Sequence, residues 1–191
     1  MKTCSNCDPE KMHSGKLVYV TPDHKHCNEC GRDLIMNDYY SEKQKRWDDY
    51  FHDLCIAVAT KSPCLSRQIG AILVRDNSVI STGFNGPARG YFHCEGTCPR
   101  KLMPGYESGK FLDQCPAAHA ELNCVATAAR NGVSVKNSTL YMNCIIPCKD
   151  CMNTLVNAGI SEIVVDDTKP YHEISVDIAI KGGIAIRRFR Q

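Results

Sequence analysis

The chain has 191 residues, which is enough for one domain of ordinary size and a small additional module but not for two full domains. Lysine and arginine exceed aspartate and glutamate by only two residues, so the composition does not favour a long polyanion as the main partner. No apolar run reaches membrane-spanning length, and the N-terminal residues lack the apolar segment of a signal peptide. A cytoplasmic location is therefore expected. Because the cytosol keeps thiols reduced, the thirteen cysteines indicate metal binding or core packing before disulfides.

Residues 1–37 contain two Cys-x-x-Cys pairs, Cys4 with Cys7 and Cys27 with Cys30. The segment has too few large apolar residues to form a core, so a metal must supply its folding energy. The spacing predicts a zinc-ribbon-like module. Its role stays open between a contact to nucleic acid or a partner and a module that caps the rest of the protein.

The rest of the chain, residues 41–191, is predicted to form a single catalytic domain. Residues Asn37 to Ser41 are interpreted as a linker, and Ser41 with Gln44 forms a capping box before a helix predicted over 42–61. Two strands, 68–75 and 78–83, follow as a hairpin around Asp76-Asn77. A long Gly/Pro/Cys-rich insertion then occupies residues 85–117.

Three further helices alternate with three strands after the insertion. Glycines that can end a helix follow each of them, at Gly132, Gly159 and Gly182-Gly183. The alternation predicts an α/β fold with a five-stranded mixed sheet and helices covering its faces. The predicted helices span residues 119–131, 148–158 and 172–181, and the predicted strands span residues 138–144, 160–165 and 184–189.

The strongest functional signal is His119-Ala120-Glu121 followed by Pro147-Cys148-Lys149-Asp150-Cys151. The pattern H-x-E with a later P-C-x-x-C is the known signature of zinc nucleobase deaminases. One histidine and two cysteines can bind zinc and leave its fourth position open, which is typical of a catalytic site. A purely structural zinc site, with Glu121 as an ordinary helix N-terminal carboxylate, is the alternative.

The two halves of this pattern are both predicted to lie at helix starts. Cys148 and Cys151 are three positions apart, so both thiolates share one face, and the positive end of the helix favours their deprotonated form. His119 and Glu121 are two positions apart and would diverge along a regular helix, so both must lie in its first turn. In that position Glu121 can accept a proton from water, donate it to the ring nitrogen beside the attacked carbon, and protonate the departing ammonia.

Seven cysteines remain after the four N-terminal and the two catalytic ones. Cys55, Cys124 and Cys144 fall among apolar neighbours and are predicted to be small core residues. Cys64, Cys94, Cys98 and Cys115 fall in loops, with His93 adjacent, and predict a structural zinc that fastens the insertion to the domain. A tetrahedral site cannot take all five side chains, so the choice between His93 and Cys94 stays open, as does the possibility of loop thiols without metal.

Residues 45–190 resemble the deoxycytidylate deaminases of the cytidine deaminase superfamily. The resemblance implies the three-layer fold of that superfamily. The resemblance rests on Cys64-Leu-Ser-Arg-Gln-Ile-Gly-Ala71, Ser81-Thr-Gly-Phe-Asn-Gly86, the cysteine-bearing insertion, the zinc pattern, Ala128-Ala-Arg-Asn-Gly132 and Tyr171-His172. The family more usually has Tyr where this chain has Phe84, and it does not usually carry the N-terminal ribbon. The implied activity is zinc-dependent conversion of dCMP to dUMP, which supplies thymidylate synthesis.

The resemblance also implies roles for individual residues. Asn85 would hydrogen-bond the nucleotide sugar, Ala120 would contact the substrate, Tyr171 would stack on the pyrimidine, and Arg130 would serve phosphate binding or a subunit contact. Ordinary alternatives are a turn residue for Asn85, helix-entry packing for Tyr171 and a helix-dipole partner for Arg130. A homohexamer, activation by dCTP and inhibition by dTTP are further implications.

Three other functions remain open. A deaminase of tRNA or single-stranded DNA could use the ribbon as a clamp, although the modest charge and the Asn85 loop argue against it. Another free cytosine nucleotide or nucleoside, including 5-substituted dCMP, could be the substrate. A regulatory zinc protein with a vestigial site would have no need of Glu121. In all cases the expected cofactor is Zn²⁺, with one catalytic ion and one or two structural ions, and no membrane partner is expected.

Overall fold

The structure is a computed structural model that describes residues 38–94, 96–107 and 110–189. The predicted ribbon, with Cys4, Cys7, Cys27 and Cys30, lies outside the described residues. A five-stranded sheet in the order β2-β1-β5-β6-β7 forms the centre of the molecule. β1 is antiparallel to β2 and β5, whereas β5, β6 and β7 are parallel, which confirms the predicted mixed sheet. The strands are β1 (Gly70–Arg75), β2 (Ser78–Phe84), β5 (Thr139–Ile146), β6 (Glu162–Pro170) and β7 (Ala185–Arg188).

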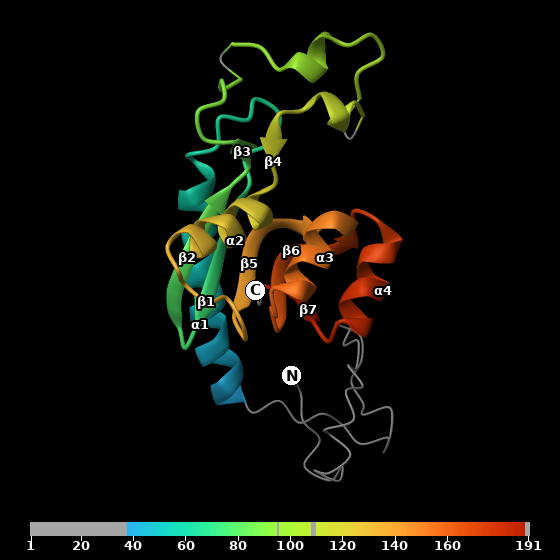
Figure 1. Cartoon of the computed structure of the whole chain (residues 1–191). Coiled ribbons are helices and arrows are strands. Elements are labelled where there is room, and N and C mark those ends of the chain that lie inside the picture. The colour runs from blue at the N-terminus through green and yellow to red at the C-terminus, as the bar shows by residue number, and fades with distance from the viewer. Residues whose placement is uncertain (1–37, 95, 108–109, 190–191) are drawn as a thin grey trace.

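Four helices cover the two faces of the sheet and give the predicted three layers (Figure 1). Helix α1 (Asp38–Ala59) packs on one face against Ile72 and Val74 of β1. The intervening Ala71 and Leu73 point to the opposite face and join the core beneath the other helices. This alternation places one buried core on each side of the sheet. The helices of the second face are α2 (Ala120–Arg130), α3 (Lys149–Asn157) and α4 (Glu173–Lys181).

Glycine allows α2 to lie very close to the sheet. A Cβ at Gly83 of β2 would lie 2.3 Å from the backbone nitrogen of Cys124 and 2.5 Å from the backbone oxygen of Ala120. Only a residue without a side chain fits this contact. Gly83 therefore sets the distance between β2 and the first turn of α2, where the predicted metal ligands begin.

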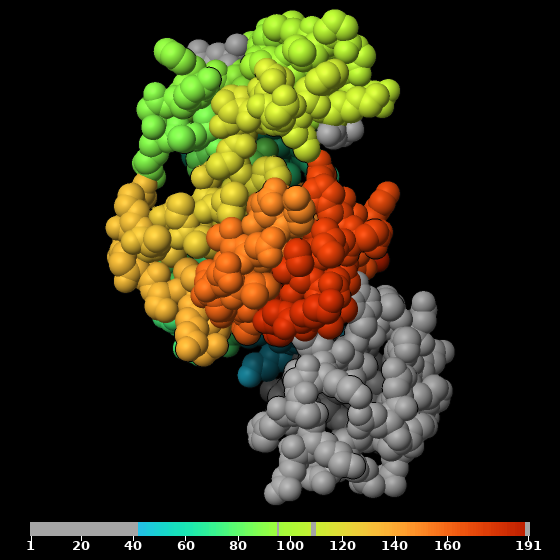
Figure 2. Space-filling model, turned by 45° about the vertical axis from the view of Figure 1, so that its right-hand side comes forward, coloured from blue at the N-terminus to red at the C-terminus, as the bar shows by residue number. Residues whose placement is uncertain are grey.

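The insertion is closed at its base by two short strands. β3 (Gly86–Pro87) pairs with β4 (Ala117–Ala118), so the two ends of the insertion leave the domain side by side. Between them lie the 3₁₀ helices η2 (Pro99–Leu102) and η3 (Leu112–Gln114). The insertion projects beyond the sheet and its helices (Figures 1 and 2).

The local turn chemistry confirms several predicted boundaries. Asp76 and Asn77 both have positive φ, at 53° and 56°, as a two-residue hairpin turn requires. Gly132 and Gly159 also have positive φ and end α2 and α3 as predicted. One boundary is wrong: α1 begins at Asp38, so Ser41 lies inside the helix and is neither its N-cap nor part of a linker. The helical periodicity identified the later turns of α1, but it could not locate the first one.

A partly buried ion cluster fastens β7 to the rest of the domain. Arg187 of β7 donates through Nη1 to Oδ2 of Asp48 at 2.6 Å and through Nε to Oε1 of Glu162 at 2.8 Å. The Asp48 side chain is fully buried, so this pairing satisfies a charge that burial would otherwise disfavour. Among the described helices, none has the length and hydrophobicity needed to cross a bilayer.

Candidate metal centre and active site

The predicted zinc ligands come from the starts of two neighbouring helices. His119 has extended backbone angles and is the N-cap of α2, and Cys148 holds the same position in α3. Cys151 lies within the first turn of α3. Glu121 lies in the first turn of α2 as expected, whereas His119 lies one position earlier than expected, at the N-cap, so its side chain does not lie along the side of the helix.

The three ligand atoms have the spacing that one zinc ion requires. The Nδ1 atom of His119 lies 3.5 Å from Sγ of Cys148 and 3.3 Å from Sγ of Cys151. Tetrahedral zinc with Zn–S near 2.3 Å and Zn–N near 2.0–2.1 Å would hold sulfur and nitrogen about 3.5 Å apart. Among the described residues, only this trio brings three such ligand atoms within 4.8 Å of one another. The residues present therefore fit the ion.

Glu121 lies beside this trio and is buried, with 4% of its surface exposed. Burial raises the pKa of its carboxyl, while a hydrogen bond from its own backbone N–H and the nearby His119 act in the opposite direction. The Cys151 thiol also hydrogen-bonds this carboxylate. A carboxyl group with a raised pKa next to a metal centre is suited to accept and return a proton, since its two protonation states are closer in free energy at neutral pH.

The pKa values of the two cysteine ligands shift in opposite directions. A hydrogen bond from Cys151 is the largest contribution that lowers the pKa of Cys148 to about 3. The same hydrogen bond, together with burial, raises the pKa of Cys151. Metal binding through both sulfurs requires both thiols to lose their protons.

Asn85 is buried at the end of β2 and is held by three hydrogen bonds of its side chain. Its Oδ1 accepts from the Ser62 hydroxyl at 2.7 Å and from the backbone N–H of Ile69 at 2.8 Å. Its Nδ2 donates to the carbonyl of Arg67 at 2.8 Å. Within the described part of the chain, these bonds leave one N–H of the amide for a substrate oxygen. In the predicted sugar contact, Asn85 can therefore only donate, through the second N–H of its Nδ2 atom.

The other predicted substrate residues lie at different distances from the metal ligands. Ala120 is fully buried between His119 and Glu121. Tyr171 is 39% exposed, directly before α4, and its ring meets the ring of His172. Arg130 is the last residue of α2, about 16 Å along the helix from His119 at 1.5 Å per residue. This distance separates Arg130 from the metal ligands of its own chain, and its role in phosphate binding, a subunit contact or the helix dipole stays a prediction.

The sequence interpretation gave roles to Tyr171 but none to its neighbour His172. The Nδ1 atom of His172 accepts the backbone N–H of Lys149, the first residue of α3, at 3.3 Å. Asn123 was also missed: its Nδ2 donates to the carbonyl of Phe84 at 2.8 Å and so ties α2 to the Asn85 loop. The only sequence signal for these two polar residues was their position next to motif residues: His172 follows Tyr171, and Asn123 lies two positions after Glu121.

The four loop cysteines predicted to bind a second zinc line one small cavity of about 20 Å³, together with the buried Arg100. The pKa of Cys94 is raised by burial and by Cys98, Cys115 and Cys64. Their sulfurs are not gathered as closely as the trio around His119. All nine cysteines that the structure describes are free thiols, and Cys55, Cys124 and Cys144 are buried as predicted.

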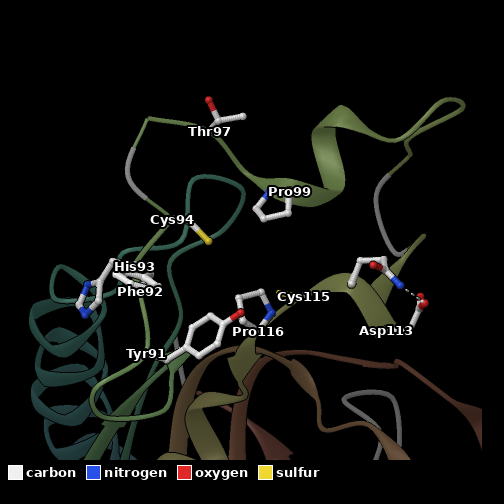
Figure 3. A pocket seen from close by; sticks show the side chains of 10 residues that line it. Tyr91, Phe92, His93, Cys94, Thr97, Pro99, Asp113, Cys115 and Pro116 are labelled. Atoms are coloured by element: carbon white, nitrogen blue, oxygen red, sulfur yellow. Dashed lines mark hydrogen bonds between the residues drawn. The ribbon is translucent and has the colours of Figure 1, made fainter.

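A second, open cavity of about 480 Å³ lies next to these cysteines (Figure 3). The sulfur of Cys94 points toward its interior, whereas the exposed ring of His93 extends to the opposite side (Figure 3). Cys94 lines the small cavity that the other three loop cysteines also line, and His93 does not line it.

Comparison with known proteins agrees with this geometry. Residues 45–166 match the family described as "Cytidine and deoxycytidylate deaminase zinc-binding region". Proteins named deoxycytidylate deaminase from Schizosaccharomyces pombe and Saccharomyces cerevisiae are 35% and 37% identical over 144 residues, which is 75% of this chain. The chain spans less than half of these two relatives, 44% and 45% of their lengths. A deoxycytidylate deaminase of Mycobacterium phage D29 is 37% identical over 62% of this chain and 92% of its own length.

Solved structures show the same fold at lower identity. The dCMP deaminase of cyanophage S-TIM5 in apo form aligns with 80% of this chain and 99% of its own, with a TM-score of 0.54 and 21% identity. The same enzyme in complex with dCMP and dUMP aligns with 81% of this chain and 99% of its own, at a TM-score of 0.55 and 20% identity.

The fold and the site define a class of protein: a three-layer α/β protein with a His-Cys-Cys metal site at the starts of two helices. The family match covers residues 45–166, which is more than half of the chain and includes all three metal ligands. The chain belongs to the cytidine and deoxycytidylate deaminase zinc-binding family.

Proposed function

We propose that this protein is a zinc-dependent hydrolase that converts dCMP to dUMP and ammonia. The observation that carries the proposal is the buried Glu121 beside the trio His119, Cys148 and Cys151, whose spacing suits a tetrahedral ion with an open position. The match to 92% of the phage D29 deoxycytidylate deaminase supports dCMP as the substrate.

His119, Cys148 and Cys151 would hold the zinc ion in this reaction. When bound, zinc supplies Lewis acidity that lowers the pKa of water from 15.7 to about 7. Glu121 accepts the proton of the water that adds to C4 of the cytosine and delivers it to N3. Glu121 then takes the proton of the C4 hydroxyl and gives it to the amino group as the C4–N4 bond breaks, so that ammonia leaves and the uracil carbonyl forms. Burial of Glu121 supports this role, because it keeps the proton in the site.

The substrate contacts belong to the same proposal. Asn85 donates its remaining N–H to the sugar, Tyr171 stacks on the pyrimidine, and Ala120 contacts the base from the first turn of α2. Arg130 serves a contact between subunits, because it lies at the far end of α2. The exposure of the Tyr171 ring supports its availability to a ligand.

We further propose that Cys64, Cys94, Cys98 and Cys115 bind a structural zinc. The shared cavity of these four side chains supports this ligand set over one that includes His93. Binding would draw the four sulfurs closer together and fasten the insertion to residues 60–69. The proposal also includes a third zinc ion, in the ribbon. It further includes a homohexameric assembly, regulation by dCTP and dTTP, and a cytoplasmic location. The free state of the described cysteines supports a reducing compartment.

An ammonia-release assay with dCMP, dCTP, deoxycytidine, cytidine and a cytosine-containing oligonucleotide tests the activity. We expect the highest kcat/KM with dCMP, because buried groups that pair with the sugar and phosphate stay unsatisfied when a ligand lacks them. Equal kcat/KM with deoxycytidine and dCMP would show that the phosphate is not recognised. Preference for the oligonucleotide or for tRNA would replace this proposal with a nucleic-acid deaminase, and no release from any of them would support a non-catalytic zinc protein.

A further inference from the structure

His172 connects α3, which begins with two of the metal ligands, to α4. Its Nδ1 atom accepts the backbone N–H of Lys149 at 3.3 Å, and Lys149 directly follows the ligand Cys148. His172 itself is the N-cap of α4, and its carbonyl accepts the backbone N–H of Ser175 at 2.9 Å. The surfaces of α3 and α4 are in contact, orange against red in Figure 2. One side chain therefore links the start of α3 to the start of α4.

This contact satisfies a helix end that has no cap of its own. The first N–H groups of a helix lack partners within the helix and are usually satisfied by the side chain of the N-cap residue. In α3 the N-cap is Cys148, which makes no side-chain capping hydrogen bond and whose sulfur faces His119. Because Cys148 is committed to the metal, the imidazole of His172 supplies an acceptor from outside the helix. Its proton then lies on Nε2.

The same ring also contacts the residue predicted to stack on the substrate. The rings of Tyr171 and His172 meet edge to face, with centroids 4.8 Å apart and planes at 84°. Such an arrangement is favourable for aromatic pairs and restricts the orientation of both rings. A displacement of His172 would therefore change the position of Tyr171 as well as that of Lys149.

We propose that His172 is a positioning residue of the active site, which fixes the ligand Cys148 through the start of α3 and orients Tyr171 for the base. The part that concerns Tyr171 rests on the proposed dCMP deamination. The part that concerns Cys148 does not, because it can be read from metal binding alone.

Three variants separate the two contacts. His172→Phe keeps an aromatic ring against Tyr171 but removes the acceptor for Lys149. His172→Asn keeps an acceptor near the position of Nδ1 but removes the ring. His172→Ala removes both contacts. Val156→Ala is the matched control, because Val156 lies at the other end of the α3–α4 contact, against Gly182.

The first measurement is metal binding by the full chain, with competition by a chelator and the visible spectrum after cobalt replaces zinc. We expect His172→Phe and His172→Ala to weaken metal binding at the His119 site about 10- to 100-fold, as other outer contacts of metal ligands do, and to shift the thiolate-to-cobalt absorption. His172→Asn and Val156→Ala should keep the affinity and spectrum of the original protein. The same affinity and spectrum in all four variants would overturn the role toward Cys148.

The second measurement is the separation of KM and kcat for dCMP. We expect His172→Asn to raise KM several-fold with a smaller change in kcat, since the ring that orients Tyr171 is lost. An unchanged KM in His172→Asn would overturn the role toward Tyr171. Absence of deamination in the original protein would contradict the proposed function but would leave the result of the cobalt experiment standing. If a variant unfolds below the assay temperature, the remaining variants are compared with Val156→Ala at a temperature at which all of them are folded.

Discussion

The hydroxyl of Ser62 lies 2.7 Å from both the backbone oxygen and the side-chain Oδ1 of Asn85, although 23 positions separate the two residues. The contact joins the loop after α1 to the end of β2 and is buried. Asn85 is therefore part of the scaffold at the same time as it is a candidate substrate residue. The two roles can be separated, because Ser62 contacts Asn85 without belonging to the proposed substrate site.

Asn85→Ala should lower both stability and activity, for different reasons. The substitution leaves the backbone N–H of Ile69 without its acceptor and the carbonyl of Arg67 without its donor, and loss of such a partner typically costs about 1–3 kcal/mol of unfolding free energy. It also removes the N–H proposed for the sugar. Ser62→Ala should lower stability by a similar amount but should lower kcat/KM for dCMP much less. Equal kcat/KM losses in the two variants would show that Asn85 acts only through the loop.

Glu121→Gln should keep the fold and the metal but lose most of the activity. The ligands stay in place, whereas the amide cannot carry the proton, and loss of general acid–base catalysis costs about 10²- to 10⁴-fold in kcat. Zinc content and ammonia release from dCMP provide the measurement. Asp150→Asn is the control, because it removes an exposed carboxylate that also acts electrostatically on His119. Activity of Glu121→Gln within a few-fold of the original would contradict the assigned role.

Metal analysis of the full chain should give three zinc ions, one at His119, one in the loop cluster and one in the ribbon. Replacing Cys98 and Cys115 with serine should remove one ion and lower the melting temperature, because structural zinc contributes folding free energy directly. Cys144→Ser is the control: it alters a buried thiol of the core, so stability should fall while the zinc content stays at three. Unchanged zinc content in the double variant would exclude the loop site.

Gly83→Ala should disturb the active site from the opposite side of α2. The added Cβ would lie 2.3 Å from the backbone nitrogen of Cys124, so α2 must move away from β2. Overpacking of this kind typically costs about 1–3 kcal/mol, and here it displaces the turn that carries Glu121. Urea unfolding and kcat should both decrease. Thr82→Ala, at an exposed position of the same strand, should change neither, and an unaffected Gly83→Ala would contradict the close contact.

Stability should decrease in alkaline solution. Burial raises the pKa of Cys124 from 9.0 to about 12 and that of Tyr141 from 10.0 to about 12, and it also raises the pKa of Cys55. Between the unfolded and folded pKa values the native state binds more protons than the unfolded chain. The stability from these groups is therefore complete below about pH 9 and is lost as pH rises toward 12, by up to about 1.4 kcal/mol per pH unit and group.

Urea unfolding at pH 8, 9.5 and 10.5, with reductant and saturating zinc, measures this slope. Cys124→Ala should reduce the slope between pH 9.5 and 10.5 relative to the original protein, because one of the titrating groups is gone. A stability that is constant over this range would contradict the pKa shifts.

The local features of this protein followed from neighbouring residues and were predictable. Asp76-Asn77 adopts positive φ at little cost, Gly132 ends α2, and His119, Glu121, Cys148 and Cys151 lie at helix starts because motif spacing and helical periodicity act over a few residues. The order of helices and strands then indicated the mixed sheet. Where the local signal was weak, at the first turn of α1, the prediction was wrong.

Contacts between distant segments were decided only by the tertiary structure. The pairing of β3 with β4, the acceptor that His172 offers to Lys149 and the ion pair of Arg187 with Asp48 each join segments separated by 23 or more positions. Such contacts depend on how strands, helices and loops pack, and the residues involved have no pattern of their own in the sequence. Cys94 lines one small cavity together with the other loop cysteines and His93 does not, because the path of the insertion sets the direction of each side chain.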